Sequence, residues 1–464
     1  MVLLKLPKKY CINLSLFFLP IRKIANSVNE QVEVVTFSVK SFFYILNTQL
    51  PGPVNLEDRS AILDILRGFA LFGVLLDNLF GFTGWGFITQ AQREALPTWH
   101  ADKIVGMLEN VFVKGKFYSL FSLLFGIGFS IIILRNEQKG INPLKVFYRR
   151  LFFLLLLGIV HLFFFWEGDI LCLYALLGFT LPLFRKLPDK KITFLAGALL
   201  LSPMLLDIFY ILFHYNPGLS LENIAQKIDK KNGIPADNFG KYLFENNAGW
   251  QEWRNWQATG YLYRYAYILG SNRIPKVLGM FLLGFYVGRK MMYLHLDEYI
   301  SLFKKLRFWG FIIGLPSAFA CFYFEIFQKH IPSPVGLLHS LFYALSVVPL
   351  CLAYTSIICL TWVKNKGQGK LTIFASMGRM ALTNYLAQTF IGIFVFYGVG
   401  LGFGGNIGPS VYIPIGIGIY LLQMMYSNIW FWYFYYGPFE WVWRMVTYGK
   451  PLKMIKSKND LLSF

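Results

Sequence analysis

The stretch LDILRGFALFGVLLDN, residues 63–78, lies inside an apolar run that extends over residues 61–82. A helix needs about 20 mostly apolar residues to cross the hydrocarbon core of a bilayer, and this run has that length. The sequence therefore predicts an all-α, polytopic integral membrane protein with about ten transmembrane helices. The other nine segments that approach this length are 117–134, 151–166, 170–184, 192–214, 274–290, 308–325, 335–361, 373–398 and 411–436.

Two of these segments, 151–166 and 170–184, are shorter than the others. They flank the triplet Glu167-Gly168-Asp169. An alternative for this pair is a tight helical hairpin that does not fully cross the membrane.

Composition excludes a water-soluble body of this size. Hydrophobic residues make up 56% of the 464 residues and charged residues only 15%, whereas soluble domains carry about 25% charged residues. The formal net charge of +20 comes from short basic clusters between apolar runs, so we expect a lipid bilayer and no nucleic acid as partner. The five cysteines form no C-x-x-C motif, and we therefore expect neither a disulfide framework nor a metal site.

The basic clusters also predict the direction of the helices. The alternate short connections 167–169 and 399–410 contain neither Lys nor Arg. Loops with an excess of Lys and Arg stay on the cytoplasmic side of a membrane, so both termini are predicted to be cytoplasmic. The basic segments are 135–150, 185–191, 289–307, 364–370 and 444–458.

The pattern of apolar and basic stretches divides the chain into four segments. They are a variable N-terminal extension (1–58), an N-terminal membrane half (59–290), a C-terminal membrane half (291–450) and a basic cytoplasmic tail (451–464). The N-terminal membrane half contains a long polar loop, 215–273, on the predicted outer side.

The first predicted helix carries ionisable side chains, which are costly inside a membrane and therefore mark a candidate functional site. Asp64 and Arg67 are spaced i, i+3 and can pair on one helix face. Asn78 lies 14 residues beyond Asp64, near the same face, while Asp77 is one position off it. The alternative is an ion pair at the cytoplasmic interface that only anchors the helix.

A histidine stands in the apolar interior of the third predicted helix. His161 lies in GIVHLFFFWEGDIL, residues 158–171, close to Glu167 and Asp169. A histidine with a carboxylate that orients it can accept and return a proton near neutral pH. The alternative is a structural histidine bonded to a neighbouring backbone carbonyl.

The ninth predicted helix begins with a polar stripe, GRMALTNYLAQ, residues 378–388. Hydrogen bonds between helices account for Thr383, Asn384 and Gln388. Arg379 needs an anion or a carboxylate as partner inside a membrane protein. In addition, Gly284-x-x-x-Gly288 is typical of close helix packing.

These motifs together resemble the YeiB family of bacterial inner-membrane proteins, which carry a C-terminal domain of unknown function. The resemblance covers about residues 60–450 and implies a multi-pass protein of the bacterial inner (plasma) membrane, without an established activity. It rests on LDILRGFALFGVLLDN (63–78), FYSLFSLLFGIGF (117–129), GIVHLFFFWEGDILCLYALLGF (158–179), GRMALTNYLAQT (378–389) and GPFEWVWR (437–444).

A more distant resemblance suggests a reaction. Asp64, Arg67, Gly68 and Asn78 are similar in pattern to the first helix of heparan-α-glucosaminide N-acetyltransferase and related transmembrane acyltransferases. This resemblance implies transfer of an acyl group from cytoplasmic acyl-CoA to an acceptor across the membrane, with the help of a histidine. His161 and His100, in PTWHAD (97–102), are the two candidates for that histidine.

We therefore predict an acyltransferase-like protein with a small-molecule, lipid or glycan acceptor at the outer face, acyl-CoA as co-substrate and no bound cofactor. The alternatives are a transporter of a small solute that uses the same charges, and a scaffold without chemistry. In the predicted site, His161 acts as general base or acyl relay, and Glu167 or Asp169 orients it. The remaining members are Asn78 for the oxyanion, Arg67 and Arg379 for CoA, and Asp64 and Asn384 as further binding residues.

Overall fold

The structure is a computed structural model, and the described part of the chain folds into α-helices and short 3₁₀ turns. Within that part there is no β-strand, and the pair Phe434–Ile455 is an isolated bridge. The all-α prediction is confirmed. The predicted extension 1–58 lies outside the described residues, which are 60–235, 239–245, 248–327 and 333–457.

Seven helical stretches of the described chain are long and apolar enough to cross a membrane. Backbone N–H and C=O groups find no water inside a bilayer, and a helix satisfies them within the segment itself. These stretches support a membrane protein. They are α2 (Ala61–Phe82), α4 with α5 (Trp99–Phe112 and Lys116–Gln138), α6 (Pro143–Phe164), α8 (Asp189–Leu212), η3 with α13 (Leu296–Tyr299 and Ile300–Phe327), α14 (Pro334–Lys364) and α17 (Pro409–Tyr433).

The other three predicted segments form shorter helices. Segment 170–184 becomes α7 (Leu171–Gly178) and the turn η2 (Leu181–Phe184). An eight-residue helix such as α7 is only about 12 Å long, so it does not cross a bilayer alone. Segment 274–290 becomes the 17-residue α12 (Arg273–Arg289). Segment 373–398 is split into α15 (Ile373–Arg379) and α16 (Ala381–Phe396). The count of ten stays a prediction.

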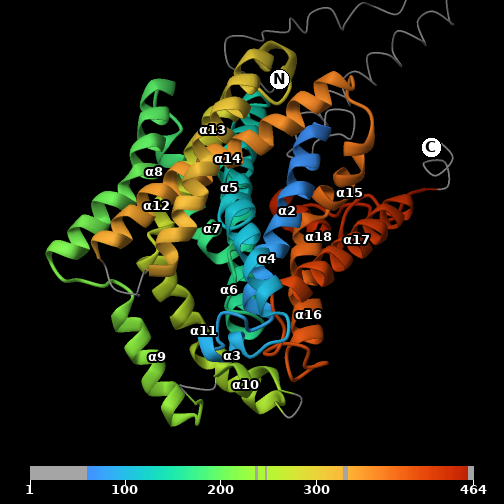
Figure 1. Cartoon of the computed structure of the whole chain (residues 1–464). Helices are drawn as coiled ribbons and strands as arrows, with labels where there is room; N and C mark the ends of the chain where they lie inside the picture. Colours follow the sequence, from blue (N-terminus) through green and yellow to red (C-terminus); the bar gives the residue numbers. More distant parts are fainter. Residues whose placement is uncertain (1–59, 236–238, 246–247, 328–332, 458–464) are drawn as a thin grey trace, which may run out of the picture. The chain divides into compact units, whose positions relative to one another are not determined.

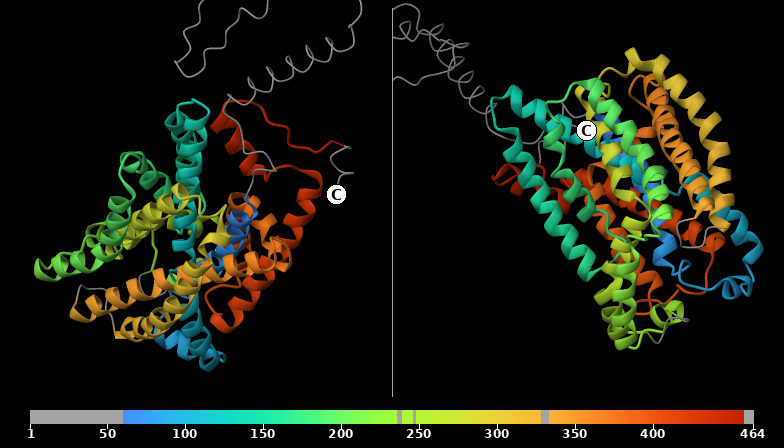
Figure 2. Two further views of the ribbon diagram at one scale, coloured as in Figure 1. Left: turned by 90° about the horizontal axis from the view of Figure 1, so that it is seen from above. Right: turned by 90° about the vertical axis from the view of Figure 1, so that its left-hand side faces the viewer.

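The predicted outer loop is itself helical. It contains α9 (Leu219–Lys231), α10 (Phe239–Phe244) and α11 (Trp250–Gly270). Figure 1 shows α9, α10 and the short α3 (Gln90–Glu94) together at one end of the helices. At the C-terminal side, α18 (Pro438–Tyr448) packs against α6 and α16, and Figure 2 shows α13 and α14 lying side by side along their length.

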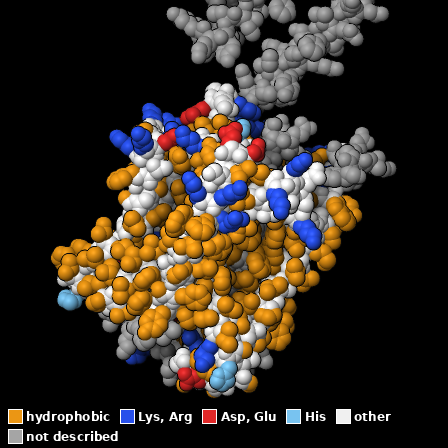
Figure 3. Space-filling view, turned by 45° about the horizontal axis from the view of Figure 1, so that its top comes forward, with side chains coloured by type: hydrophobic (Ala, Val, Ile, Leu, Met, Phe, Trp, Pro, Cys, Tyr) orange, Lys and Arg blue, Asp and Glu red, His pale blue; other side chains and the backbone are white. Residues whose placement is uncertain are grey.

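Lys and Arg side chains gather toward the opposite end, above a surface that hydrophobic side chains cover (Figure 3). Ion pairs join two of the basic segments there: Asp189, at the start of α8, lies 3.3 Å from Arg289 and 2.9 Å from Lys290, at the end of α12. We call this end the basic end and the other the far end. The gathering agrees with the loop alternation in the sequence, and the orientation of the termini stays a prediction.

Glycines allow close backbone contact at two helix crossings. A Cβ on Gly378 of α15 would collide with the backbone of Asp64 in α2, and a Cβ on Gly68 would collide with that of Phe374. Likewise, a Cβ on Gly284 of α12 would collide with the backbone of Leu123 in α5. Gly284 therefore has the packing role that its sequence motif predicted.

Candidate functional site

A hydrogen-bonded chain of three buried side chains lies at the junction of α6, the 165–170 turn and α16. His161, in the last turn of α6, has its Nδ1 2.9 Å from Oδ2 of Asp169 and its Nε2 2.9 Å from Oγ1 of Thr389. The side chains of His161 and Asp169 are 1% and 0% exposed. We call Asp169, His161 and Thr389 the His161 chain.

Backbone and side-chain donors fix the carboxylate end of this chain. The Oδ1 atom of Asp169 accepts a hydrogen bond from the backbone N–H of Cys172 in the first turn of α7, at 2.7 Å. Arg264 of α11 donates to the backbone carbonyls of Asp169, at 2.8 and 3.1 Å, and of Gly168, at 3.1 Å. With both carboxylate oxygens engaged, Asp169 holds the imidazole in one orientation, as a base-orienting residue does.

Glu167, the other predicted orienting residue, lies within electrostatic reach of His161 but makes no hydrogen bond or ion pair with it. Its Oε2 atom accepts a hydrogen bond from Nε1 of Trp256 in α11, at 3.0 Å. Burial raises the pKa of Glu167, and the bond from Trp256 opposes that rise. Of the two carboxylates, Asp169 is the one that hydrogen-bonds to the imidazole, and its orienting role stays a prediction. His100, the competing histidine, is exposed on α4.

The predicted oxyanion residue lies on α2 at a half-buried position. Asn78 is adjacent to Asp77, which the helix phase had set aside. Asp77 lies within electrostatic reach of Arg273, Lys114, Lys116 and Arg264. Asp77 therefore has more charged neighbours than Asn78 has. This was not predictable from α2 alone, because the cations come from the link between α4 and α5 and from α5, α11 and α12.

The predicted Asp64–Arg67 pair is present near the start of α2. Nη1 of Arg67 lies 2.7 Å from Oδ1 of Asp64, and the two side chains are 29% and 3% exposed. Arg67 and Arg444 of α18 also lie within electrostatic reach of Arg150 in α6. Arg150 stacks on the ring of Trp443 at 4.0 Å. Three arginines thus share the region where α2, α6 and α18 meet.

Arg379 and Asn384 lie on either side of the break between α15 and α16. The guanidinium of Arg379 lies 3.8 Å from the ring centroid of Phe431. Asn384 is fully buried, and its side-chain amide donates to Oγ of Ser427 at 2.9 Å, while its backbone carbonyl accepts from Gln423 at 3.1 Å. Asn384 thus makes the hydrogen bonds between helices that its sequence setting predicted.

The break between α15 and α16 at Met380 is stabilised by a residue that is distant in the sequence. Glu440 of α18 accepts hydrogen bonds from the backbone N–H groups of Leu382, at 2.7 Å, and Thr383, at 3.1 Å, and from the hydroxyl of Thr383, at 2.6 Å. An anion at a helix N-terminus satisfies amide groups that the helix leaves open. Glu440 therefore caps α16 and stabilises the break.

The predicted residues form two groups. Asp64 and Asn78 are 14 residues apart on one helix, so their backbones are about 21 Å apart. Asp64, Arg67 and Arg379 lie toward the basic end, and the His161 chain lies toward the far end. No group of three or more His, Cys, Asp or Glu side chains that could hold a metal occurs among the described residues.

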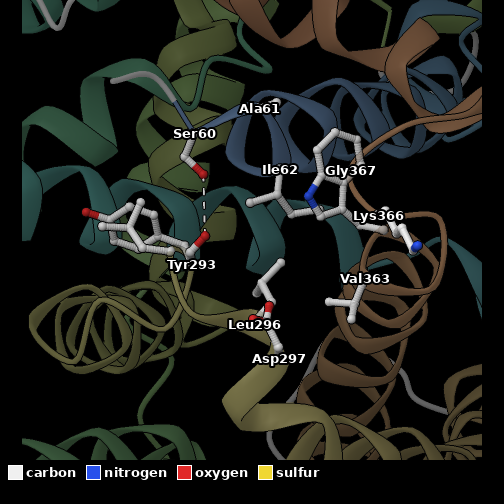
Figure 4. A pocket seen from close by; sticks show the side chains of 11 residues that line it. Ser60, Ala61, Ile62, Tyr293, Leu296, Asp297, Val363, Lys366 and Gly367 are labelled. Atoms are coloured by element: carbon white, nitrogen blue, oxygen red, sulfur yellow. Dashed lines mark hydrogen bonds between the residues drawn. The ribbon is translucent and has the colours of Figure 1, made fainter. Parts of the chain in front are cut away.

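A separate pocket of about 450 Å³ opens at the basic end, between the start of α2, the 293–297 turn and the end of α14. Figure 4 shows Tyr293, Asp297 and Lys366 around it. None of the predicted site residues lines it, so this pocket was not predicted from the sequence.

Two curated bacterial proteins match nearly the whole chain. Uncharacterized protein YxaH of Bacillus subtilis (strain 168) is 32% identical over 405 residues, which cover 85% of this chain and 96% of that protein. Uncharacterized protein YeiB of Escherichia coli (strain K12) is 28% identical over 418 residues, which cover 84% and 96%. The chain belongs to the YeiB family. Residues 287–450 of this YeiB-family protein also match the family described as "Protein of unknown function (DUF418)".

The matches confirm the family that the sequence motifs indicated, and those motifs include the described site. Thr389 is the last residue of GRMALTNYLAQT, and His161 and Asp169 both lie in GIVHLFFFWEGDILCLYALLGF. The resemblance to transmembrane acyltransferases stays a prediction.

Proposed function

We propose that this YeiB-family protein is a transmembrane acyltransferase that moves an acyl group from cytoplasmic acyl-CoA to a glycan, lipid or small-molecule acceptor at the outer face of the bacterial inner membrane. In this proposal the chain crosses the membrane ten times with the basic end and both termini in the cytoplasm. The far end, with the His161 chain, then faces the acceptor.

The observation that carries the proposal is the His161 chain itself. A hydroxyl within hydrogen-bond reach of an imidazole, which a buried carboxylate orients, is the arrangement of an activated nucleophile. Here Thr389, His161 and Asp169 supply the three groups, with 2.9 Å at each link. A buried structural histidine also needs partners for both ring nitrogens, so the feature that favours catalysis is the combination of a carboxylate at Nδ1 with a hydroxyl at Nε2.

The arrangement supports a two-step transfer. Asp169 accepts a hydrogen bond from Nδ1–H, and Nε2 of His161 takes the proton of the Thr389 hydroxyl as Oγ1 attacks the thioester carbonyl. The C–S bond breaks, and the leaving CoA thiolate takes that proton from His161. An acceptor hydroxyl then attacks the threonyl ester and loses its proton to His161, which returns it to Oγ1 of Thr389. The two steps transfer the acyl group from CoA to the acceptor and regenerate the free Thr389 hydroxyl, and they need no further reactant.

Burial of the His161 chain suits this chemistry and requires motion. A site without water protects a threonyl ester from hydrolysis and strengthens each electrostatic contact. Because the His161 side chain is 1% exposed, substrates reach it only when α6, α11 and α16 separate locally. The Arg67–Arg150–Arg444 region at the basic end would attract the CoA phosphates, since arginine binds phosphate well.

A transporter is the second candidate, and the break between α15 and α16 favours it. Discontinuous helices line the substrate sites of many transporters, and α16 starts anew at Ala381 with Glu440 as its cap. A transporter would accumulate a solute in proteoliposomes without consuming acyl-CoA, whereas the proposed enzyme would release CoA thiol.

Mass spectrometry of envelope lipids and glycans, with and without the gene, tests the proposal in cells. Complementation with His161→Ala should fail to restore any gene-dependent acylation, while His100→Ala should restore it. If His100→Ala abolishes the modification and His161→Ala does not, the proposed role of the His161 chain is wrong. Reporter fusions in 135–150 and 364–370 should report cytoplasm and a fusion near residue 230 the outer side, and the reverse result would refute the orientation.

A further inference from the structure

A second cluster of charged side chains lies at the far end, where α5, α12, α13 and α14 meet. Its cations are Lys114, Lys116, Arg273 and Lys276, and we call these four residues the cationic cluster. None of them belongs to the set predicted from the sequence. Charged residues within membrane helices are costly and mark substrate or ion sites when they face the bundle interior.

Tyrosine rings hold two of the cations. The guanidinium of Arg273, the first residue of α12, lies 4.3 Å from the ring centroid of Tyr118 and 5.2 Å from that of Tyr267. Nζ of Lys276, one turn later, lies 4.2 Å from the ring centroid of Tyr343. The hydroxyls of Tyr118 and Tyr343 are 3.1 Å apart. The rings fix the cations in place but supply no negative charge.

The guanidinium of Arg273 has N–H donors without a protein acceptor. It makes no hydrogen bond or ion pair with any residue that the structure describes, although a guanidinium carries five N–H donors. Its side chain is only half-buried, so a ligand can reach it. It also stands in the first turn of α12, where the helix macrodipole disfavours a cation and favours an anion. An anion beside Arg273 would relieve both the unmet donors and this unfavourable position.

The carboxylates nearby do not neutralise the cluster. Glu325 of α13 pairs with Lys114 and accepts from Asn110. Asp207 of α8 accepts from Asn272 and is an electrostatic neighbour of Lys276. Asp77 of α2 and Glu109 of α4 are the other carboxylates within electrostatic reach, and Arg264 of α11 is a fifth cation. Five cations thus face four carboxylates, which leaves one positive charge for a ligand.

The two remaining lysines donate to backbone carbonyls rather than to carboxylates. Lys116 bonds to the carbonyl of Asn110 at 2.8 Å and Lys276 to that of Ser271 at 2.8 Å. Lys276, Tyr118 and Tyr343 also line a small cavity of about 10 Å³, with an apolar floor that includes Met280 and Val347. This volume is about that of one water molecule, so the cavity itself is too small to hold the anion.

The cationic cluster adjoins the His161 chain. Arg264, which holds the backbone of Asp169, lies within electrostatic reach of Arg273 and of Asp169. Asp77 lies within electrostatic reach of both Arg264 and Arg273. A ligand anchored at Arg273 would therefore extend toward the residues that carry the proposed chemistry.

We infer that the cationic cluster binds the anionic group, a carboxylate or a phosphate, of the acyl acceptor. This inference rests on the proposed acyl transfer for the word acceptor, while the anion site stands on its own contacts. The anionic group can belong to a soluble sugar acid or to the headgroup of an anionic lipid. In either case a neutral acceptor would bind much more weakly.

Anion binding by the purified full-length protein in phosphatidylcholine nanodiscs tests the inference without any acyl donor. Titrations with glucuronate, inorganic phosphate and glucose at constant ionic strength, followed by thermal unfolding, should show stabilisation by the first two only. Arg273→Gln should weaken the binding about tenfold, since one charge-assisted contact is lost. Arg254→Gln, an exposed arginine on α11 that bonds to Gln251, is the matched control and should bind as the wild type does.

Further measurements distinguish a lipid headgroup from a soluble anion, and a second variant covers a failure of the first to fold. If a lipid headgroup is the ligand, nanodiscs with phosphatidylglycerol should block glucuronate binding, and native mass spectrometry should find that lipid on the wild type but not on Arg273→Gln. Should Arg273→Gln fail to fold, Lys276→Met should show the same weakening. Equal binding by wild type and both variants, or no binding of any of these anions, would overturn the inference. If the anions bind but a separate incubation with acyl-CoA releases no CoA thiol, the result would support the site and refute acyl transfer.

Discussion

Replacement of Asp169 by Asn tests how the His161 chain works, because it changes the proton pattern and hardly changes shape. Asp169 accepts from Cys172 N–H at 2.7 Å and from His161 Nδ1 at 2.9 Å. An asparagine has one acceptor oxygen and one donor NH₂ group. If the oxygen keeps the Cys172 amide, the NH₂ group faces Nδ1 and donates to it. The imidazole proton then moves to Nε2, which can no longer take the proton of Thr389.

The magnitudes follow from these two hydrogen bonds. Two charge-assisted bonds become neutral ones, a loss of about 1–3 kcal/mol in the free energy of unfolding. Asp169→Ala would strand both donors in a buried site and cost about 2–6 kcal/mol, so it is the poorer test. Where an analogous Asp→Asn change reverses the histidine tautomer in serine proteases, the rate falls about 10⁴-fold. We expect Asp169→Asn to lower the rate of acyl transfer by a similar factor.

The assay is the release of CoA thiol by purified protein without acceptor, with acetyl-, butyryl- and palmitoyl-CoA as donors. The wild type should release about one thiol per protein in a burst, and Asp169→Asn should lose the burst while thermal unfolding shows a folded protein. Glu167→Gln, at the carboxylate that makes no hydrogen bond to His161, is the control and should keep the burst. A burst in Asp169→Asn within tenfold of the wild-type rate would refute the role given to Asp169.

Three further predictions concern stability. At the Asp64–Arg67 pair, either single change to Ala should lower folded yield more than the double change, because one buried charge is left without its partner; equal yields for all three variants would place the pair in water. Gly378→Ala should destabilise the protein because its Cβ would collide with the α2 backbone, whereas Gly128→Ala, where a Cβ meets open space, should be neutral or stabilising by up to about 1 kcal/mol; similar melting temperatures for both would contradict the α2–α15 contact. Burial raises the pKa of Glu167 above 4.5, so the folded state binds its proton more tightly and stability should fall as pH rises above 4.5; Glu167→Gln should reduce that pH dependence in thermal unfolding, and an unchanged profile would contradict the burial.

The long apolar helices were predictable from the sequence because apolar length alone indicates them. Segments such as 61–82 and 335–361 match α2 and α14 within a few residues. The break inside 373–398 was not predictable, since Glu440, which caps α16, is 58 residues from Leu382 in the sequence. Local composition carries no signal for a cap supplied from so far along the chain.

In the candidate site too, local sequence features were predictable and long-range contacts were not. His161 and its nearby carboxylates were visible because they lie in one short stretch. The choice between Glu167 and Asp169 was not, because Trp256, 89 residues away, takes up Glu167. Thr389 lies in the motif GRMALTNYLAQT, but its part in the site was not predictable, because its partner His161 is 228 residues away. Long-range pairing therefore decided which of the polar residues form the His161 chain.

Mass spectrometry of the purified protein after incubation with acetyl-CoA tests the central claim most directly. The account predicts one added acetyl group per wild-type protein, located on the peptide that contains Thr389, with retention of the adduct in Thr389→Ser and His100→Ala. The adduct should be absent in Thr389→Val and His161→Ala. An adduct that persists in Thr389→Val, or a wild-type protein that stays unmodified with acetyl-, butyryl- and palmitoyl-CoA alike, would contradict the proposed acyl transfer through the His161 chain.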